Sequence, residues 1–364
     1  MSVSVTSATL ADGREIIYFD DSDPAPGERV LDDPRELPQV TAASEMRRDP
    51  LTGEWVAFAA HRMNRTFMPP ANENPLAPSQ PGQLSTEIPS PSYDVVVFEN
   101  RFPSFSTHMD VPDDFAYEVD GVERRPAAAR CEVVCFTSDP GSSFKELSPR
   151  RIRTVIEAWA HRTAALSAID GVRQVFPFEN RGEEIGVTLQ HPHGQIYSYP
   201  FLSPRLSRIV EKVKDNPGLF AEIVERESNG DRVLKETANF LVYVPAAAKW
   251  PVEAMVMPKR QVADFTELTD AEKDELAPLL KQLYTAIDGF FPGVEKTPYI
   301  AGWTQAPVAG PEREAVRMHL QLFSLMRSPN RLKYLAGSES AQAVWISDTT
   351  PEKIAERFRE VWPQ

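Results

Sequence analysis

The sequence His191-Pro192-His193-Gly194-Gln195, which runs on into Ile196-Tyr197-Ser198-Tyr199, predicts a short strand. In an extended segment residues two apart point the same way, so His191, His193 and Gln195 are expected on one face. Pro192 favours an extended conformation at His191, and Gly194 omits a side chain where a phosphate could approach closely. The stretch therefore predicts a binding site for an anion.

The two histidines also suit covalent chemistry. An imidazole has an unperturbed pKa near ~6.5, so at pH 7 it is largely neutral and can attack phosphorus without first losing a proton. The alternative is a pair of half-buried structural histidines. The proline, glycine and glutamine around them favour a catalytic set of His193, Gln195 and His191.

Composition limits the class of protein. The 364 residues exceed one ordinary domain, and 41% hydrophobic with 25% charged residues is typical of a soluble globular protein. The net charge of −14 argues against a nucleic-acid surface. No apolar run approaches the ~18 residues that span a bilayer, and the N-terminus lacks a basic region followed by an apolar core, so we expect no membrane contact and a cytoplasmic location. Cys131 and Cys135 are expected to be buried free thiols.

The motif at 191–195 resembles the nucleophile motif of the galactose-1-phosphate uridylyltransferases, a branch of the histidine triad superfamily. The likeness runs in order from about Arg47 to the C-terminus. It implies an α+β fold in which a histidine-triad-like unit is duplicated and a mainly antiparallel sheet, a half-barrel, is flanked by helices. We divide the chain into a mobile or loosely packed N-terminal arm (1–45), a catalytic unit (46–203) and a C-terminal unit (204–364).

The duplication is also visible in the order of predicted elements. A helix opened by Ser148-Pro149 is followed by a strand and then by the motif, and the same order occurs in the second half. We expect His319 and Gln321 to take the places of His191 and His193. The second half would then have lost its nucleophile, because glutamine cannot attack phosphorus.

Polar side chains at predicted strand ends are candidates for substrate binding. Two arginines three apart after a strand make a phosphate clamp, and the alternative is a solvated strand end. An asparagine at a strand end can contact a uracil or ribose edge, and the alternative is ordinary turn chemistry. The resemblance supports the binding role and implies this set in the N-terminal half: Arg62, Arg65, Asn100, Arg101, Asn180 and Thr188.

A polar, turn-rich segment over residues 330–340 is the second candidate binding element. A lysine beside a Gly-Ser turn suits a phosphate and a glutamate suits sugar hydroxyls, whereas the alternative is an exposed loop. The resemblance implies that this segment binds the hexose 1-phosphate in the active site of a neighbouring subunit, so we expect a homodimer with shared sites. Its candidate residues are Lys333, Tyr334, Ala336, Gly337 and Glu339.

The resemblance also implies two metal sites, but the sequence lacks their ligands. A tetrahedral zinc needs about four ligands, mostly thiolate or imidazole. At the zinc positions of many members this chain has Asn74, Ala77, Pro140 and His191. At the positions where some members hold a metal with one glutamate and three histidines it has Ile209, Thr304, His319 and Gln321. We therefore expect no zinc, no iron and no other cofactor.

The resemblance implies a nucleotidyltransferase of galactose metabolism, acting in the Leloir pathway. It would exchange UMP between UDP-glucose and galactose 1-phosphate through a uridylyl-histidine, with UDP-glucose or UDP-galactose and a hexose 1-phosphate as partners. Two alternatives remain open. One is a phosphorylase or adenylyltransferase that acts on ADP-glucose or a dinucleoside polyphosphate with the same histidine. The other is a non-catalytic protein that binds nucleotide sugars.

Overall fold

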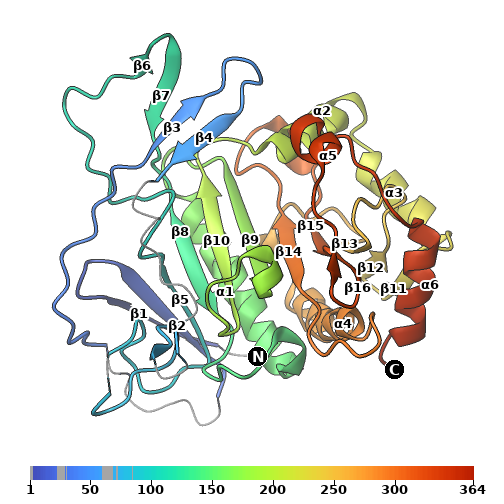
Figure 1. The fold of residues 1–364 in the computed structure, drawn as a ribbon, viewed down its shortest axis with the longest axis horizontal. Coiled ribbons are helices and arrows are strands. Elements are labelled where there is room, and N and C mark those ends of the chain that lie inside the picture. The colour runs from blue at the N-terminus through green and yellow to red at the C-terminus, as the bar shows by residue number, and fades with distance from the viewer. Residues whose placement is uncertain (1–2, 23–28, 30, 60–68, 71–72, 84) are drawn as a thin grey trace.

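The computed structural model describes residues 3–22, 29, 31–59, 69–70, 73–83 and 85–364 (Figure 1). Arg62 and Arg65 lie outside these described residues. Among the described helices, none combines the length and the apolar character that a membrane-crossing helix needs.

An antiparallel sheet of 11 strands forms the centre of the molecule. It is open, because β1 and β11 form two separate edges. In spatial order its strands are β1 (Ser4–Thr9), β2 (Glu15–Asp20), β5 (Val95–Glu99), β8 (Cys131–Cys135), β10 (His193–Tyr199), β9 (Gln174–Arg181), β14 (Tyr299–Thr304), β15 (His319–Ser324), β13 (Val252–Pro258), β12 (Phe240–Tyr243) and β11 (Val233–Glu236).

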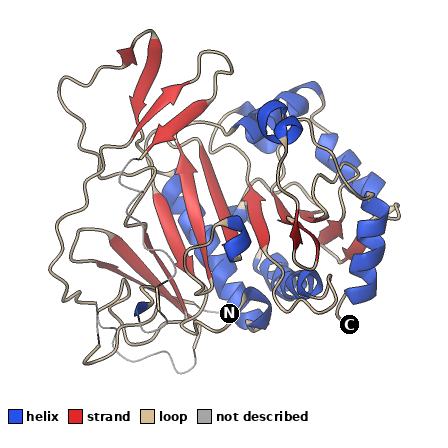
Figure 2. Ribbon diagram, in the orientation of Figure 1, coloured by secondary structure: helices blue, strands red, loops and turns tan. Residues whose placement is uncertain are grey.

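In the described part of the chain, two smaller sheets and six α-helices complete the fold. The helices concentrate in the C-terminal half (Figure 2). They are α1 (Pro149–Ser167), α2 (Pro204–Asp215), α3 (Leu219–Ser228), α4 (Asp270–Asp288), α5 (Gly337–Gln342) and α6 (Pro351–Val361). The described short 3-10 helices are η3 (Phe144–Glu146), η4 (Glu183–Ile185), η5 (Phe265–Glu267) and η6 (Pro311–Glu314). The small sheets contain β4 (Trp55–Phe58), β3 (Glu45–Arg48), β7 (Val122–Pro126) and β6 (Glu118–Val119), and β16 (Met326–Ser328) with β17 (Arg331–Leu332).

The strand order confirms the internal duplication. The two halves meet where β9 pairs with β14, and on each side the next strands outward, β10 and β15, begin with a histidine. Helices α1 and α4 precede these strand pairs and pack against each other. The large aromatic core lies here, with Trp159 of α1 against Trp303 of β14. The fold is thus α+β, a duplicated unit with an antiparallel sheet flanked by helices.

The expected register of the second half is wrong by two residues. His193 begins β10 and donates its Nδ1–H to the His191 carbonyl oxygen at 2.7 Å. His319 begins β15 and donates its Nδ1–H to the Arg317 carbonyl oxygen at 3.0 Å. His319 is therefore the counterpart of His193, and not of His191. Matching residue types between the two halves gives the wrong alignment, because corresponding residues are those at equivalent positions in the sheet.

Strand β2, within the N-terminal arm, is not loosely packed. β2 pairs with β5, and the side chains of Ile16, Ile17, Tyr18 and Phe19 are at most 1% exposed. The guanidinium of Arg14, also buried, pairs with Asp12 and Glu87. The acidic, proline-rich composition of the arm did not indicate that it contains β2, a strand whose apolar residues are buried on both faces. Both cysteines are buried on β8 and neither is part of a disulfide bond, as expected.

Candidate active site

Strand β10 presents the motif at the edge of three cavities. Burial alternates along it, with His193, Gln195 and Tyr197 half-buried and Gly194 and Ile196 fully buried. The alternation follows from the period-2 geometry of a strand. His193 lies opposite Cys135 of β8, and Gln195 lies opposite Phe178 of β9. Two central neighbours therefore fix the backbone that carries the reactive histidine.

Gly194 has a packing role that the sequence interpretation missed. A Cβ at this position would lie 2.8 Å from the ring of Phe136 and 2.9 Å from the carbonyl oxygen of Phe178. Both contacts are too close for carbon, so a side chain here would force the neighbours to move. The expectation that Gly194 makes room for a phosphate is wrong, because its missing side chain makes room for Phe136.

His193 has the protonation pattern of a nucleophile. Because a carbonyl oxygen can only accept, the contact of 2.7 Å to His191 assigns a proton to Nδ1. The lone pair then resides on Nε2. Burial is the main cause that lowers the pKa of His193 from its ordinary value, so the ring is neutral at pH 7.

His191 lies in a different environment, just before the strand. Its side chain is 3% exposed, and its two ring nitrogens contact Asn74 and the carbonyl oxygen of Thr137. Burial lowers the pKa of His191 to about 4, so this ring is neutral as well. His191 thus contacts His193 through its backbone carbonyl, and both nitrogens of its own ring are hydrogen-bonded to other residues.

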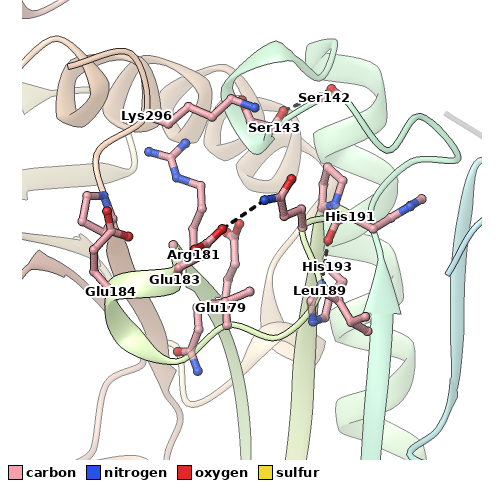
Figure 3. A pocket seen from close by; sticks show the side chains of 16 residues that line it. Ser142, Ser143, Glu179, Arg181, Glu183, Glu184, Leu189, His191, His193 and Lys296 are labelled. Atoms are coloured by element: carbon pink, nitrogen blue, oxygen red, sulfur yellow. Dashed lines mark hydrogen bonds between the residues drawn. The ribbon is translucent and has the colours of Figure 1, made fainter. Parts of the chain in front are cut away.

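Three cavities meet at His193. The first has a volume of about 310 Å³ and lies between the histidines and a wall with Glu179, Arg181 and Lys296 (Figure 3). The second, about 160 Å³, and the third, about 250 Å³, both contain Thr188 and Gln195. A ligand that spans these cavities would place a phosphate beside Nε2 and extend in more than one direction from it.

Four of the predicted binding residues line the same cavities. Asn180 borders the first and third cavities, and Thr188 borders the second and third. Asn100 and Arg101 border the second. The Asn100 side-chain oxygen accepts the Phe102 N–H at 2.9 Å, so part of its role is the turn chemistry considered as the alternative. The structure therefore brings these residues together with the predicted catalytic residues His193 and Gln195.

The segment at 330–340 is not part of these cavities. Lys333 is 1% exposed, and its ammonium donates to the carbonyl oxygens of Lys249 and Ile346 and lies 3.5 Å from the buried carboxylate of Glu339. Both charged side chains are thus held inside their own chain. In contrast, Tyr334 is 77% exposed.

The same segment continues into a short helix. Ala336 caps α5 and Gly337 begins it (Figure 1). The expectation that the Lys333 and Glu339 side chains reach out of their own chain to a phosphate and a sugar does not match this arrangement. A buried lysine next to a carboxylate and two carbonyl groups instead fixes the shape of the segment.

Glu179 and Arg181 were missed as site residues. Glu179 accepts a hydrogen bond from Tyr299 at 2.8 Å, and its burial raises its pKa to about 7. Arg181 pairs with Asp288 and donates to the carbonyl oxygen of Thr297. The available signal was a carboxylate and a guanidinium on either side of Asn180, directly after the apolar run Val175–Phe178.

The donors at the implied zinc position do not fit a zinc ion. Asn74, Pro140 and His191 do line one cavity, so the three positions converge. Of these, only His191 offers a good zinc ligand, and both of its nitrogens are already hydrogen-bonded. Within the described residues, no group of three or more His, Cys, Asp and Glu could hold a metal ion. The absence of a metal cofactor stays a prediction.

The second implied metal position does not fit a cation either. Ile209 offers no donor atom, and His319 packs against Phe220. The Gln321 amide nitrogen donates to Glu253 at 2.6 Å, and its oxygen accepts from the Arg205 guanidinium. A resident arginine would repel a metal ion at this place.

Comparisons with known proteins show which family the chain resembles. The family described as "Galactose-1-phosphate uridyl transferase, N-terminal domain" matches residues 35–203, and the corresponding C-terminal domain matches residues 209–363. A galactose-1-phosphate uridylyltransferase from Streptomyces lividans is 41% identical, over 98% of this chain and 97% of its own length. One from Thermotoga maritima is 33% identical, over 87% and 98%.

A solved structure gives the same result. A structure named as a uridylyltransferase superposes with a TM-score of 0.76 at 31% identity, and the match covers 87% of this chain and 98% of that one. Both halves of the fold, the motif strand and nearly the full length are thus shared. The chain belongs to the galactose-1-phosphate uridyl transferase family.

Proposed function

We propose that this protein exchanges UMP between UDP-glucose and galactose 1-phosphate by double displacement, as a nucleotidyltransferase of galactose metabolism. The observation that carries the proposal is the hydrogen bond of 2.7 Å from His193 Nδ1 to the His191 carbonyl oxygen. This bond leaves a lone pair on Nε2 at the meeting point of the three cavities. The family membership supports the choice of substrates.

In the first step Nε2 of neutral His193 attacks the α-phosphorus of UDP-glucose. A P–N bond forms as the bond to the bridging oxygen breaks, and glucose 1-phosphate leaves with that electron pair. The ring then carries a positive charge, which its Nδ1–H shares with the His191 carbonyl oxygen. In the second step a phosphate oxygen of galactose 1-phosphate attacks phosphorus, the P–N bond breaks and UDP-galactose leaves.

Negative charge develops on the non-bridging phosphate oxygens during both steps, and hydrogen-bond donors are needed to stabilise it. Gln195 and Thr188 line the second and third cavities beside His193. Among the described residues the Gln195 side chain has no hydrogen-bond partner, so it is available to a ligand. We assign these two side chains, with Asn180, to the phosphate. Arg62 and Arg65 lie outside the described residues and stay predicted phosphate ligands.

The nucleoside fits the second cavity best. Phe98, Phe102 and Leu76 supply apolar walls there, and Asn100 and Arg101 supply polar groups at its edge. A base needs flat apolar contact together with a few polar contacts. The first cavity, with Lys296 and Arg181 in its wall, is left for the anionic sugar phosphate.

We further propose a cytoplasmic homodimer with shared sites. Around α5 four apolar side chains are exposed, which is unusual for a surface that only meets water: Tyr334, Leu335, Val344 and Ile346. In this arrangement Tyr334, Ala336 and Gly337 contact the ligand of the neighbouring subunit, and the buried Lys333–Glu339 pair holds the segment in shape.

A substrate comparison tests the proposal. Exchange should be fast with UDP-glucose and galactose 1-phosphate, slow with ADP-glucose and inorganic phosphate, and reduced by more than about a hundredfold in His193→Asn. A preference for ADP-glucose would replace the proposal with the phosphorylase alternative. Tight binding of UDP-glucose without any exchange would replace it with the non-catalytic one.

A further inference from the structure

A closed set of hydrogen bonds surrounds the His191 ring at the position where the resemblance implies zinc. Asn74 Nδ2 lies 2.9 Å from His191 Nδ1. The Thr137 carbonyl oxygen lies 2.7 Å from His191 Nε2, and the Tyr93 hydroxyl lies 2.8 Å from the same nitrogen. The three partners come from three separate parts of the chain: Asn74 from the loop well before β5, Tyr93 from two residues before β5, and Thr137 from just after β8. The ring is thus held from several sides.

The direction of each bond follows from the atoms. The Asn74 side-chain oxygen accepts the Leu76 N–H at 3.0 Å, so its amide nitrogen must face His191. An amide nitrogen only donates, and therefore His191 Nδ1 is the acceptor. The proton of His191 is then on Nε2, where the Thr137 carbonyl oxygen accepts it. The single hydroxyl proton of Tyr93 is shared between the carbonyl oxygens of Leu76 and Thr137, at 2.9 and 2.8 Å, so toward His191 Nε2 the Tyr93 oxygen is an acceptor, which closes the set.

The set acts on the nucleophile through the backbone. The His191 carbonyl oxygen accepts the Nδ1–H of His193, so its direction determines where His193 Nε2 points. The hydrogen bonds that hold the His191 ring also restrict movement of the His191 Cα, to which both the side chain and the carbonyl carbon are bonded, and so they help to keep this carbonyl in place. A displacement of about 1 Å at a reacting atom can cost roughly a hundredfold in rate.

We propose that Asn74 is a positioning residue for His193, and that the hydrogen bonds of Asn74, Tyr93 and Thr137 to His191 replace a zinc ion in this protein. Asn74 makes no contact with the reacting atoms and works through His191. The kinetic part of this proposal rests on the proposed transferase function. Its structural part, the proton on His191 Nε2 and the lack of zinc affinity, does not.

The kinetic test compares Asn74→Leu with a matched control, Thr86→Val. Leucine keeps the volume of Asn74 but cannot donate to His191. Thr86 belongs to the same loop and donates to the Ala77 carbonyl oxygen at 2.6 Å, so its loss loosens the loop without touching His191. Asn74→Leu should lower kcat about 10- to 100-fold with KM within about twofold, and the control should keep kcat. Unchanged kcat in Asn74→Leu, or an equal loss in the control, would overturn the proposal.

Two further measurements use the unaltered full-length protein, so they do not depend on whether a variant folds. Nitrogen-15 NMR should show His191 with a proton on Nε2 and none on Nδ1. Zinc titration followed by dialysis should leave well under one zinc per chain, with no change in the His191 signals. Stoichiometric zinc, or a proton on Nδ1, would contradict the proposal. If the wild-type protein showed no exchange at all, the proposed function would fail while these two measurements would still decide the structural part.

Discussion

Replacing Gly194 with alanine should weaken both the fold and the reaction. The new Cβ would lie 2.8 Å from Phe136 and 2.9 Å from the Phe178 carbonyl oxygen, whereas ordinary contacts begin near 3.4 Å. Backbone cannot rotate away as a side chain can, so β10 must shift by about half an ångström. Overpacking of this kind costs about 1–3 kcal/mol, and reduced freedom of the unfolded chain returns about 0.4–1 kcal/mol.

The net loss of about 1–2 kcal/mol can be measured by denaturant unfolding. At ~2.1 cal/mol/K of unfolding entropy per residue, 364 residues give about 0.8 kcal/mol/K, so Tm should fall by about 1–3 °C. The exchange rate should fall by more than the smaller fraction of folded protein explains, because His193 directly precedes Gly194 on the strand. A matched control is Gly302→Ala on β14, whose Cβ would have ring atoms of half-buried Phe176 as its nearest neighbours, the closest at 2.8 Å. Equal effects of the two substitutions, or full stability and rate in Gly194→Ala, would refute the reasoning.

Three further outcomes are expected. The free energy of unfolding of the wild-type protein should decline by up to ~3 kcal/mol between about pH 4.5 and 7, because folded Glu179 keeps a proton that the unfolded chain releases. Urea unfolding of the Glu179→Gln variant across this pH range should not show that decline. Lys333→Met should lower the melting temperature, because Glu339 and two carbonyl oxygens lose a buried donor, whereas Tyr334→Ala should change stability by less than ~0.5 kcal/mol and lower kcat/KM, as thermal unfolding and exchange assays can show. His319→Asn should keep the exchange rate within about twofold, because the His319 ring is buried against Phe220; a larger loss at equal stability would mean that the second half takes part in catalysis.

Local signals in the sequence were sufficient for the main elements. Ser148 does cap α1, accepting the Arg151 N–H at 3.1 Å, and proline is the first residue of that helix. The motif does lie at the start of a strand, because the alternation after His193 matches one half-exposed face. These predictions held because each depends on residues within a few positions of one another.

The predictions that failed depend on contacts between distant segments. β2 is buried because it pairs with β5, nearly 80 residues further along the chain, and composition does not show such a partner. Lys333 points inward because the carbonyl oxygen of Lys249 and the carboxylate of Glu339 are there to receive it. The role of Asn74 could not be predicted either, since its partner His191 is 117 residues away.

The central claim, that His193 carries the transferred group, is tested most directly by covalent labelling. The protein is incubated with UDP-glucose labelled at the α-phosphate, quenched, and digested to locate the label. We expect one uridylyl group on His193, its release by galactose 1-phosphate, an unchanged label in His319→Asn and none in His193→Asn. Rapid exchange by a wild-type protein that never carries the label, or a label on any other residue, would contradict the mechanism.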